Sequence, residues 1–427
     1  MTDARMAQPG VSRAPTDWKT RAMQRRIRQR YAAERRFRLL GLGAVVGSAA
    51  FLAFLLVTMF AQGLPGFTET RIALPIDLPA AGVSLDPARL RGTGADLALT
   101  GAGLEGAVDA AASAAYPNDG GAALLSDGAW TVVRDAVKRD PSLLTRRAII
   151  DVPAASEIDI ANKGDGAPEA ETQVRQLQAR GVLSRGLNTG FFGASDSTDP
   201  TRVGIWGAFK GSLLTMLVTL AIAFPVGVLS ALYLEEYAPR NCWTDLIEVS
   251  INNLAAVPSI IFGLLGLAVF LGTFGLPRSA PIVGGLTLAL MTMPVIVIAG
   301  RNAIKGVPPS IRDAALGVGA SPVQVVFHHV LPLALPGILT GTIIGMARAL
   351  GETAPLLMIG MRAFIASPPE GLRDPATALP VQIFLWSDEV NRGFVEKTSA
   401  AIIVLLVFLL AMNGIAIYLR NKFETRW

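Results

Sequence analysis

The stretch D-A-A-L-G-V-G-A-S-P-V-Q-V-V-F-H-H-V-L-P, Asp313 to Pro332, decides the fold of this chain. It is a short polar interruption between two strongly apolar segments. Asp313, Ala314 and Ala315 predict a small-residue helical turn with one acid at its start, and three residues separate Ala315 from Gly319. Because glycine adopts backbone conformations closed to other residues, we expect a tight turn at Gly319.

A second helix is predicted directly after this turn. Ser321 is a suitable N-cap, and Pro322 fits the first helical position, where its missing N–H costs nothing. Leu331 and Pro332 close the stretch and open the next apolar run. The pattern therefore predicts a structured loop between two membrane-spanning segments.

The composition is that of a membrane protein. The chain is 51% apolar and 17% charged, with a mean hydropathy of +0.46. Its one cysteine, Cys242, excludes an intrachain disulfide. Any part outside the membrane must therefore be stabilised by its own core.

Long apolar segments predict six transmembrane helices, since a crossing needs about 20 residues. They are Leu39–Ala61, Ser212–Tyr233, Ile251–Leu271, Pro281–Gly300, Leu331–Met361 and Ala400–Leu419.

The charge distribution predicts the orientation. Residues 1–40 hold eleven Lys/Arg and three Asp/Glu, whereas residues 61–206 hold thirteen Lys/Arg and eighteen Asp/Glu. By the positive-inside rule both termini are cytoplasmic and residues 62–200 are outside. The loop after Gly300 then lies inside, although the acidic stretch Glu235–Glu248 on the same side departs from the rule. We expect a multi-pass membrane protein.

The N-terminus is predicted as a basic cytoplasmic arm over residues 1–38 and a first transmembrane helix over 39–61. The apolar run is too long for a typical signal peptide, and no A-x-A cleavage site follows it, so retention as an anchor is expected. The basic segment Arg21–Arg38 fits either a topology anchor or an amphipathic helix on anionic lipid.

Residues 62–200 are predicted as an inserted α+β domain, because their composition shifts to Gly, Ala, Asp and Ser. Trp130–Val133 and Ala148–Val152 indicate strands, and Ala170–Gly181 indicates a helix. Both histidines lie elsewhere, so no metal cluster is expected in this domain. Docking of a partner and a stabilising or spacer role both remain open for it.

Catalytic motifs are missing from the sequence. No G-x-x-x-x-G-K-[ST] loop or H-E-x-x-H motif is present, and no Ser/His/Asp or Cys/His set has a catalytic context. We therefore expect no catalytic, metal or cofactor site on this chain. If transport uses ATP, another chain hydrolyses it.

Arg348 and Glu352 are the candidate site in the fifth apolar segment. They lie four residues apart, near the middle of Leu331–Met361, where a charge is costly unless it is paired or faces an aqueous path. The planar guanidinium donates two parallel hydrogen bonds to oxyanions. Arg348 therefore offers a positive site on an anion path, oriented by Glu352, or the two residues form a pair that only holds helices together.

The segment Asp313–Pro332 resembles the EAA loop of ABC importer permeases. The spacing acid-Ala-Ala, three residues, Gly, nine residues, an apolar position, one residue and Leu-Pro is present, with aspartate as the acid and His329 in the apolar position. The segment A-R-A-L-G-E-T-A-P-L-L, with Arg348 and Glu352, is similar to the signature of the A-type permease of the phosphate-specific ABC importer (PstA). Ala256–Leu264 is also similar to that family, and the resemblance covers about residues 205–425.

This resemblance implies a multi-pass protein of the bacterial inner membrane with a five-helix permease core over residues 205–427. The domain over residues 62–200 is an addition that the shortest family members lack. The chain would be half of an importer for inorganic phosphate and would not be an enzyme. Its implied partners are a second permease (PstC type), an ATPase pair (PstB type) and a periplasmic phosphate-binding protein (PstS type). Membrane lipid surrounds it, no nucleic acid is expected, and ATP and magnesium bind the ATPase.

The same resemblance assigns the EAA-like loop to coupling with the ATPase. The residues implied are Asp313, Ala314, Ala315, Gly319, Ser321, Leu331 and Pro332. Three other readings stay open: a permease for sulfate, molybdate or phosphonate, a membrane-anchored sensor, and a secondary transporter. The G-E-T-A-P segment argues against the first, the short cytoplasmic loops against the second, and the EAA-like loop against the third.

Overall fold

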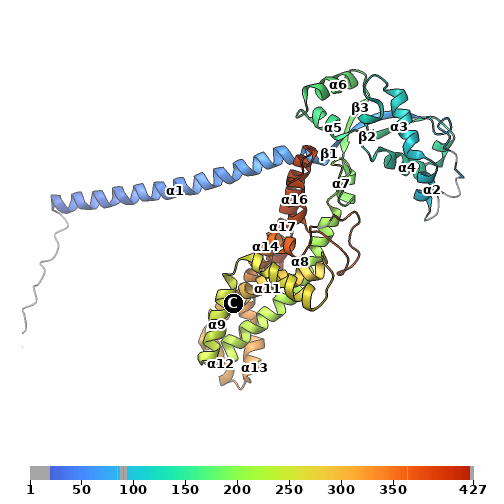
Figure 1. Ribbon diagram of the computed structural model, residues 1–427. Coiled ribbons are helices and arrows are strands. Elements are labelled where there is room, and N and C mark those ends of the chain that lie inside the picture. Colours follow the sequence, from blue (N-terminus) through green and yellow to red (C-terminus); the bar gives the residue numbers. More distant parts are fainter. Residues whose placement is uncertain (1–19, 84, 87–89, 91–93, 363, 424–427) are drawn as a thin grey trace, which may run out of the picture. The chain divides into compact units, whose positions relative to one another are not determined.

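The computed structural model describes residues 20–83, 85–86, 90, 94–362 and 364–423. The chain divides into two compact units, Met1–Met59 and Phe60–Trp427. The first unit contains most of helix α1 (Arg21–Gly63), a single helix that joins the basic segment to the apolar run without a break (Figure 1). The predicted helix 39–61 lies within α1, and residues 1–19 of the predicted arm lie outside the described residues.

An α+β region opens the second unit. Strand β1 (Thr68–Ile76) lies between β2 (Ala148–Pro153) and β3 (Leu183–Leu187), and both neighbours run antiparallel to it. Ile72 pairs with Val152 on one side and Leu183 on the other. The helices of this region are α2 (Ala95–Gly101), α3 (Leu104–Ala115), α4 (Ala129–Arg139), α5 (Ser156–Lys163), α6 (Pro168–Ala179) and α7 (Thr189–Gly193), with short 3₁₀ turns η1 (Pro65–Phe67), η3 (Gly121–Leu124) and η4 (Pro141–Leu144).

Buried side chains alternate with more exposed ones along β1, and the buried ones form the core of this region. Ile72, Leu74 and Ile76 are at most 2% exposed and lie on one face of the strand, because successive strand side chains point to opposite faces. Helices α3 and α4 add Leu104 and Val133 to the same core. The region thus has a hydrophobic core of its own, as a part without disulfides requires.

The expected elements of this region are partly confirmed. Ala148–Val152 lies in β2, and Ala170–Gly181 largely coincides with α6. The strand at Trp130–Val133 was wrong, because these residues are in α4. The burial of Ala129, Val133 and Val137 has helical spacing, so packing overrides the β propensity of the Thr-Val-Val run.

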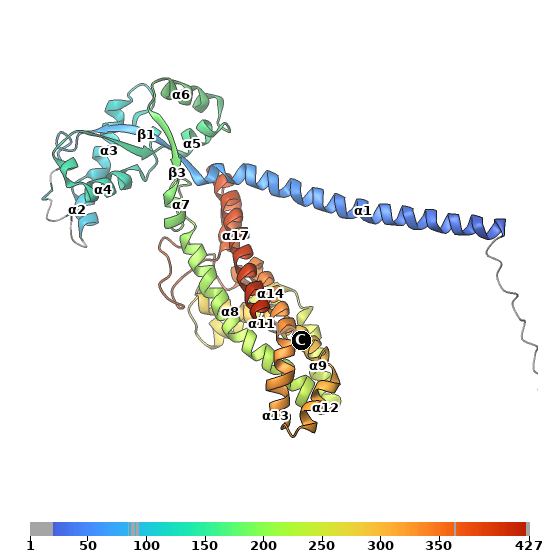
Figure 2. The same cartoon turned by 180° about the vertical axis from the view of Figure 1, so that it is seen from behind.

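Helices fill the rest of the chain. The longest are α8 (Trp206–Leu232), α11 (Pro281–Lys305), α14 (Leu331–Gly351) and α17 (Gly393–Phe423). Shorter ones are α9 (Cys242–Ala255), α10 (Ser259–Gly266), α12 (Pro309–Gly317), α13 (Pro322–Val325), α15 (Ala354–Met358) and α16 (Leu379–Ser387), and π-helical turns extend α8 (η5, Tyr233–Tyr237), α10 (η6, Leu267–Thr273) and α13 (η7, Val326–Val330). Helices α12 and α13 lie together at one end of this bundle (Figure 2).

Small residues let three of these helices approach closely. A Cβ added to Gly227 of α8 would lie 2.8 Å from Ile296 Cγ2 of α11, and one on Gly345 of α14 would lie 3.0 Å from Thr292 Cγ2 of α11. Gly341 of α14 meets Ala299 in the same way. Such contacts are typical of membrane helices, which associate through backbone proximity.

In the described part of the chain, five helices are long and apolar enough to cross a membrane: Arg21–Phe67, Trp206–Tyr237, Pro281–Lys305, Pro322–Gly351 and Gly393–Lys422. A pair bent by 101°, Cys242–Ala255 and Ser259–Thr273, makes a sixth span if it counts as one. The predicted architecture, a polytopic helical protein with an inserted α+β part, is confirmed.

Two of the predicted spans are not continuous helices. Ile251–Leu271 breaks before Ser259, because Pro258 lacks an N–H and disfavours helical backbone at Val257. Leu331–Met361 breaks at Glu352, whose backbone is extended, and Pro355 lies in the first turn of the next helix.

Candidate functional site

Arg348 and Glu352 form a loose pair at the break between α14 and α15. The Arg348 Nε–Glu352 Oε1 distance is 3.5 Å, and no second contact joins the two groups among the described residues. The side chain of Arg348 is 51% exposed and that of Glu352 is 18% exposed. The guanidinium therefore keeps most of its donors available.

The packing of α14 on α11 gives the level of Arg348 in the bundle. The helices run antiparallel, so that Gly337, Gly341 and Gly345 face Ala303, Ala299 and Thr292. The next turn of α14, which carries Arg348, is thus level with the residues just before Thr292, near the middle of Pro281–Lys305. Arg348 lies in the last turn of its own helix, yet close to the mid-height of the neighbouring one.

Two broken helices meet beyond Arg348. Gly263 of α10 packs against Pro355 and Met358 of α15, and a Cβ there would lie 2.7 Å from Pro355 Cα. Both short helices follow a break, one after Pro258 and the other after Glu352. Discontinuous helices expose backbone groups to ions and substrates in membrane transporters. Arg348 therefore lies close to the break between α14 and α15.

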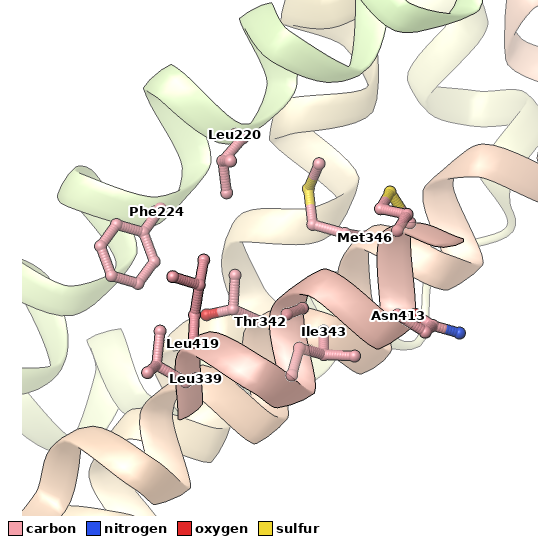
Figure 3. A pocket seen from close by; sticks show the side chains of 10 residues that line it. Leu220, Phe224, Leu339, Thr342, Ile343, Met346, Asn413 and Leu419 are labelled. Atoms are coloured by element: carbon pink, nitrogen blue, oxygen red, sulfur yellow. The ribbon is translucent and has the colours of Figure 1, made fainter. Parts of the chain in front are cut away.

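A separate pocket of about 240 Å³ lies between α8, α14 and α17 (Figure 3). Leu220, Phe224, Ile343 and Met346 line it, together with Thr342, whose hydroxyl is bonded to the carbonyl of Ile338. A charged ligand would lose its hydration here and meet only one further polar side chain of the lining, that of Asn413. This pocket suits an acyl chain or an apolar side chain and not an anion.

The predicted coupling residues lie at the α12–α13 end of the bundle. Asp313 and Ala314 are exposed, and Ala315 is 6% exposed. All three lie within α12, so the predicted helical turn is present, but the helix already begins at Pro309. The Pro308-Pro309 pair moves the start, because proline fits the first helical position.

The turn between α12 and α13 follows the sequence prediction. Gly319 has φ +91°, in the left-handed region that favours glycine. Ser321 caps α13: its hydroxyl accepts from the Gln324 N–H, and the Gln324 side chain accepts from the Ser321 N–H. Leu331 begins α14, with Pro332 in its first turn, so the next apolar helix opens where expected.

Apolar side chains are exposed beside this turn. Val318 is 86% exposed, Val323 55% and Leu316 49%. Such a concentration at the end of a helix pair is typical of an interaction surface.

Ion pairs attach α12 to the adjacent helix ends. Arg312 binds Glu236 at 2.7 Å and donates to the carbonyls of Ile304 and Val307. Arg301 pairs with Glu235, and with Glu248 at 2.7 Å. None of these ion pairs was predicted from the sequence. Two oppositely charged stretches expected on the same side of the membrane were the signal that could have revealed the pairs.

Two family matches divide the chain. Residues 208–425, slightly more than half of the 427, match the family described as binding-protein-dependent transport system inner membrane component. The chain belongs to this family. Residues 24–172 match a domain of unknown function, DUF3333.

Curated relatives of this inner membrane component are named as permeases. "Phosphate transport system permease protein PstA 1" of Mycobacterium tuberculosis (strain CDC 1551 / Oshkosh) is 31% identical over 48% of this chain and 66% of its own length. "Phosphate transport system permease protein PstA" of Yersinia pestis is 30% identical over 50% of this chain and 71% of its own. "Probable ABC transporter permease protein YqgI" of Bacillus subtilis (strain 168) is 36% identical over 36% of this chain and 52% of its own length. The chain thus spans less than two thirds of the length of the M. tuberculosis and B. subtilis relatives. The predicted resemblance to PstA-type permeases is confirmed.

Solved structures resemble the inner membrane component more distantly. A chain of the MetNI methionine ABC transporter is 18% identical over 52% of this chain and 95% of its own, with a TM-score of 0.40. A chain of a bacterial ABC transporter involved in the import of the acidic polysaccharide alginate is 18% identical over 51% of this chain and 79% of its own, with a TM-score of 0.39.

Proposed function

We propose that this chain is the transmembrane permease subunit of an ATP-driven importer for inorganic phosphate. The observation that carries the proposal is the exposed, loosely held guanidinium of Arg348 at a helix break near mid-height of the bundle. The names of the curated relatives point to the same substrate.

An anion crossing the membrane needs a compensating cation, because a bare charge in a low-dielectric slab is very costly. Arginine is suitable, since its pKa stays above about 12 in proteins. Glu352 holds the guanidinium between turnovers and releases it when phosphate arrives. A single arginine binds the ion weakly enough for it to leave.

The division of the chain forms part of this proposal. Residues 1–38 are a cytoplasmic arm, 39–61 a transmembrane anchor, 62–200 a periplasmic domain and 205–427 the permease core. Both termini are cytoplasmic, and the charge asymmetry of the sequence supports this orientation. The exposed apolar residues beside Gly319 suit docking of an ATPase pair, which binds ATP and magnesium. A second permease and a periplasmic phosphate-binding protein complete the importer.

Phosphate uptake by variants of Arg348 tests the path. Arg348→Gln abolishes uptake while the complex still assembles, Arg348→Lys retains little because the planar fork is lost, and Glu352→Gln impairs uptake less. Arg278→Gln is the matched control, since Arg278 is exposed and outside these helices. Uptake and complex yield are measured together for each variant.

Normal uptake by Arg348→Gln would show that the site is wrong. If that variant fails only because the complex does not assemble, the Arg348–Glu352 pair is structural. Equal competition by sulfate, molybdate or phosphonate would favour a permease for another oxyanion.

A further inference from the structure

The α+β region contains a cavity of about 730 Å³ that neither family match explains. Strands β1 and β2 and helix α4 form its walls, and residues 188–202 line it as well. This last segment leads directly into α8. The cavity thus adjoins both the body of the α+β region and its connection to the bundle.

Two arginines of this cavity have no acidic partner among the described residues. Arg71, Arg139 and Arg202 line it, together with two acids. Both acids are already paired, Glu69 with Arg71 at 2.7 Å and Asp135 with Arg134, a residue outside the lining, at 2.9 Å. Arg139 and Arg202 remain, so the lining carries a net positive charge.

The other cations of α4 are occupied elsewhere. Lys138 donates to Asp96 at 2.8 Å, and this hydrogen bond lowers the pKa of Asp96 below its ordinary value. Arg134 also approaches Asp96, at 3.5 Å. The available positive charge on this helix is therefore Arg139, in its last turn.

Arg202 is held in place by its surroundings. Its aliphatic stem lies against Gly128, where any side chain would collide with it. The preceding residues are fixed as well: Asp199 accepts hydrogen bonds from the Ser126 hydroxyl and from the N–H and hydroxyl of Thr201, each at 2.8 Å. The stem of Arg202 is therefore supported, although the residue as a whole is exposed.

A buried amide in the cavity lining also lacks a partner. Asn188 is 1% exposed, and its Oδ1 accepts from the Phe191 N–H at 2.9 Å. Its Nδ2 has no hydrogen-bond partner in the described part of the chain. An unmet buried donor costs about 1–3 kcal/mol, so an acceptor at this position is favourable.

We propose that this cavity binds a small oxyanion of the phosphate or sulfate class between Arg139 and Arg202. Both guanidinium groups donate charge-assisted hydrogen bonds to such a ligand, and Asn188 Nδ2 provides a further donor. The bound ion bridges α4 and the segment that enters α8. This site is distinct from Arg348 and does not depend on the transported substrate.

Hydrogen–deuterium exchange of the full chain in lipid nanodiscs tests the site. Inorganic phosphate, sulfate and chloride are compared at matched ionic strength, and exchange is followed in peptides from residues 128–139 and 188–202. Phosphate or sulfate protects both segments, whereas chloride does not. The Arg139→Gln/Arg202→Gln double variant raises the half-saturating concentration of the oxyanion about tenfold or more. The reason is that hydrogen bonds to charged groups contribute at least a tenfold factor to affinity.

Arg147→Gln is the matched control, because Arg147 is an exposed arginine of the same region outside the cavity. Its half-saturating concentration remains that of the unchanged chain. The proposal fails if neither oxyanion protects these peptides, if the double variant is protected as well as the unchanged chain, or if Arg147→Gln weakens protection equally. Protection that requires an added binding protein would indicate an acidic protein surface as the ligand and would also overturn it. Arg348→Gln keeps the protection by oxyanions, so failure of the proposed transport site and failure of this cavity site are distinguishable.

Discussion

At the scale of single residues, Gly319 shows how one backbone conformation shapes the end of the bundle. Its φ of +91° lies in the left-handed region, although no atom within 4 Å would block a side chain. The requirement for glycine is therefore conformational and not steric. The turn separates the exposed Val318, at the end of α12, from the capped start of α13.

A β-branched residue at this position should disturb coupling without preventing insertion. Gly319→Val costs about 1–2 kcal/mol in the left-handed conformation, so the turn relaxes and the docking surface changes shape. We expect reduced phosphate uptake at normal membrane levels of the chain. Gly317→Val is the control, because Gly317 has equally open surroundings and no positive φ. Full uptake by Gly319→Val would exclude this role of the turn.

At the scale of helices, α11 is the centre of the bundle. Its small residues and those of α8 and α14 form two seams along which backbones approach closely. The seams bring Arg348 level with the middle of α11. Thr287 and Thr292 are buried in α11, and their hydroxyls bond to carbonyls one turn earlier, so they add no unmet polar group.

Filling a seam should destabilise the bundle. In Gly341→Leu the new side chain collides with Ala299, and overpacking of this kind costs about 1–3 kcal/mol. We expect a lower thermal midpoint and a lower yield of monodisperse protein in detergent. Gly414→Leu on α17 is the control, because nothing lies within 4 Å of a Cβ there. Equal behaviour of the two variants would contradict the seam.

At the scale of the whole molecule, buried ion pairs attach the α+β region to α17. Lys163 of α5 is 1% exposed at its side chain and binds Asp159 at 2.7 Å and Glu396 of α17 at 2.8 Å. Lys397 donates to the carbonyl of Gly66 at 2.9 Å. Burial of these charges restricts the geometry, because each must keep its partner.

Removing one acid from this junction should loosen it. Glu396→Gln leaves Lys163 with Asp159 and the Thr68 carbonyl, and breaking a buried pair costs about 3 kcal/mol or more. We expect faster hydrogen–deuterium exchange in α5 and at the start of α17. Glu389→Gln, at an exposed acid nearby in sequence, should change neither segment. Unchanged exchange in Glu396→Gln would show that the junction does not depend on this pair.

The features that the sequence predicted correctly are local, because each depends on residues close together in the chain. Hydropathy located six apolar segments, and the Gly319, Ser321 and Pro322 pattern predicted the loop and its cap. Each is a local property, because insertion depends on a continuous apolar run and capping on residues three apart. The pairing of Arg348 with Glu352 followed from the same kind of spacing.

The sequence by itself determined the class of protein, the number of apolar segments and the capped turn between α12 and α13. Tertiary structure alone decided that Trp130–Val133 is helical and that Arg348 lies level with the middle of α11. It also assembled the cavity of Arg139 and Arg202 from segments about sixty residues apart. These features depend on packing between distant segments, which local propensity does not encode.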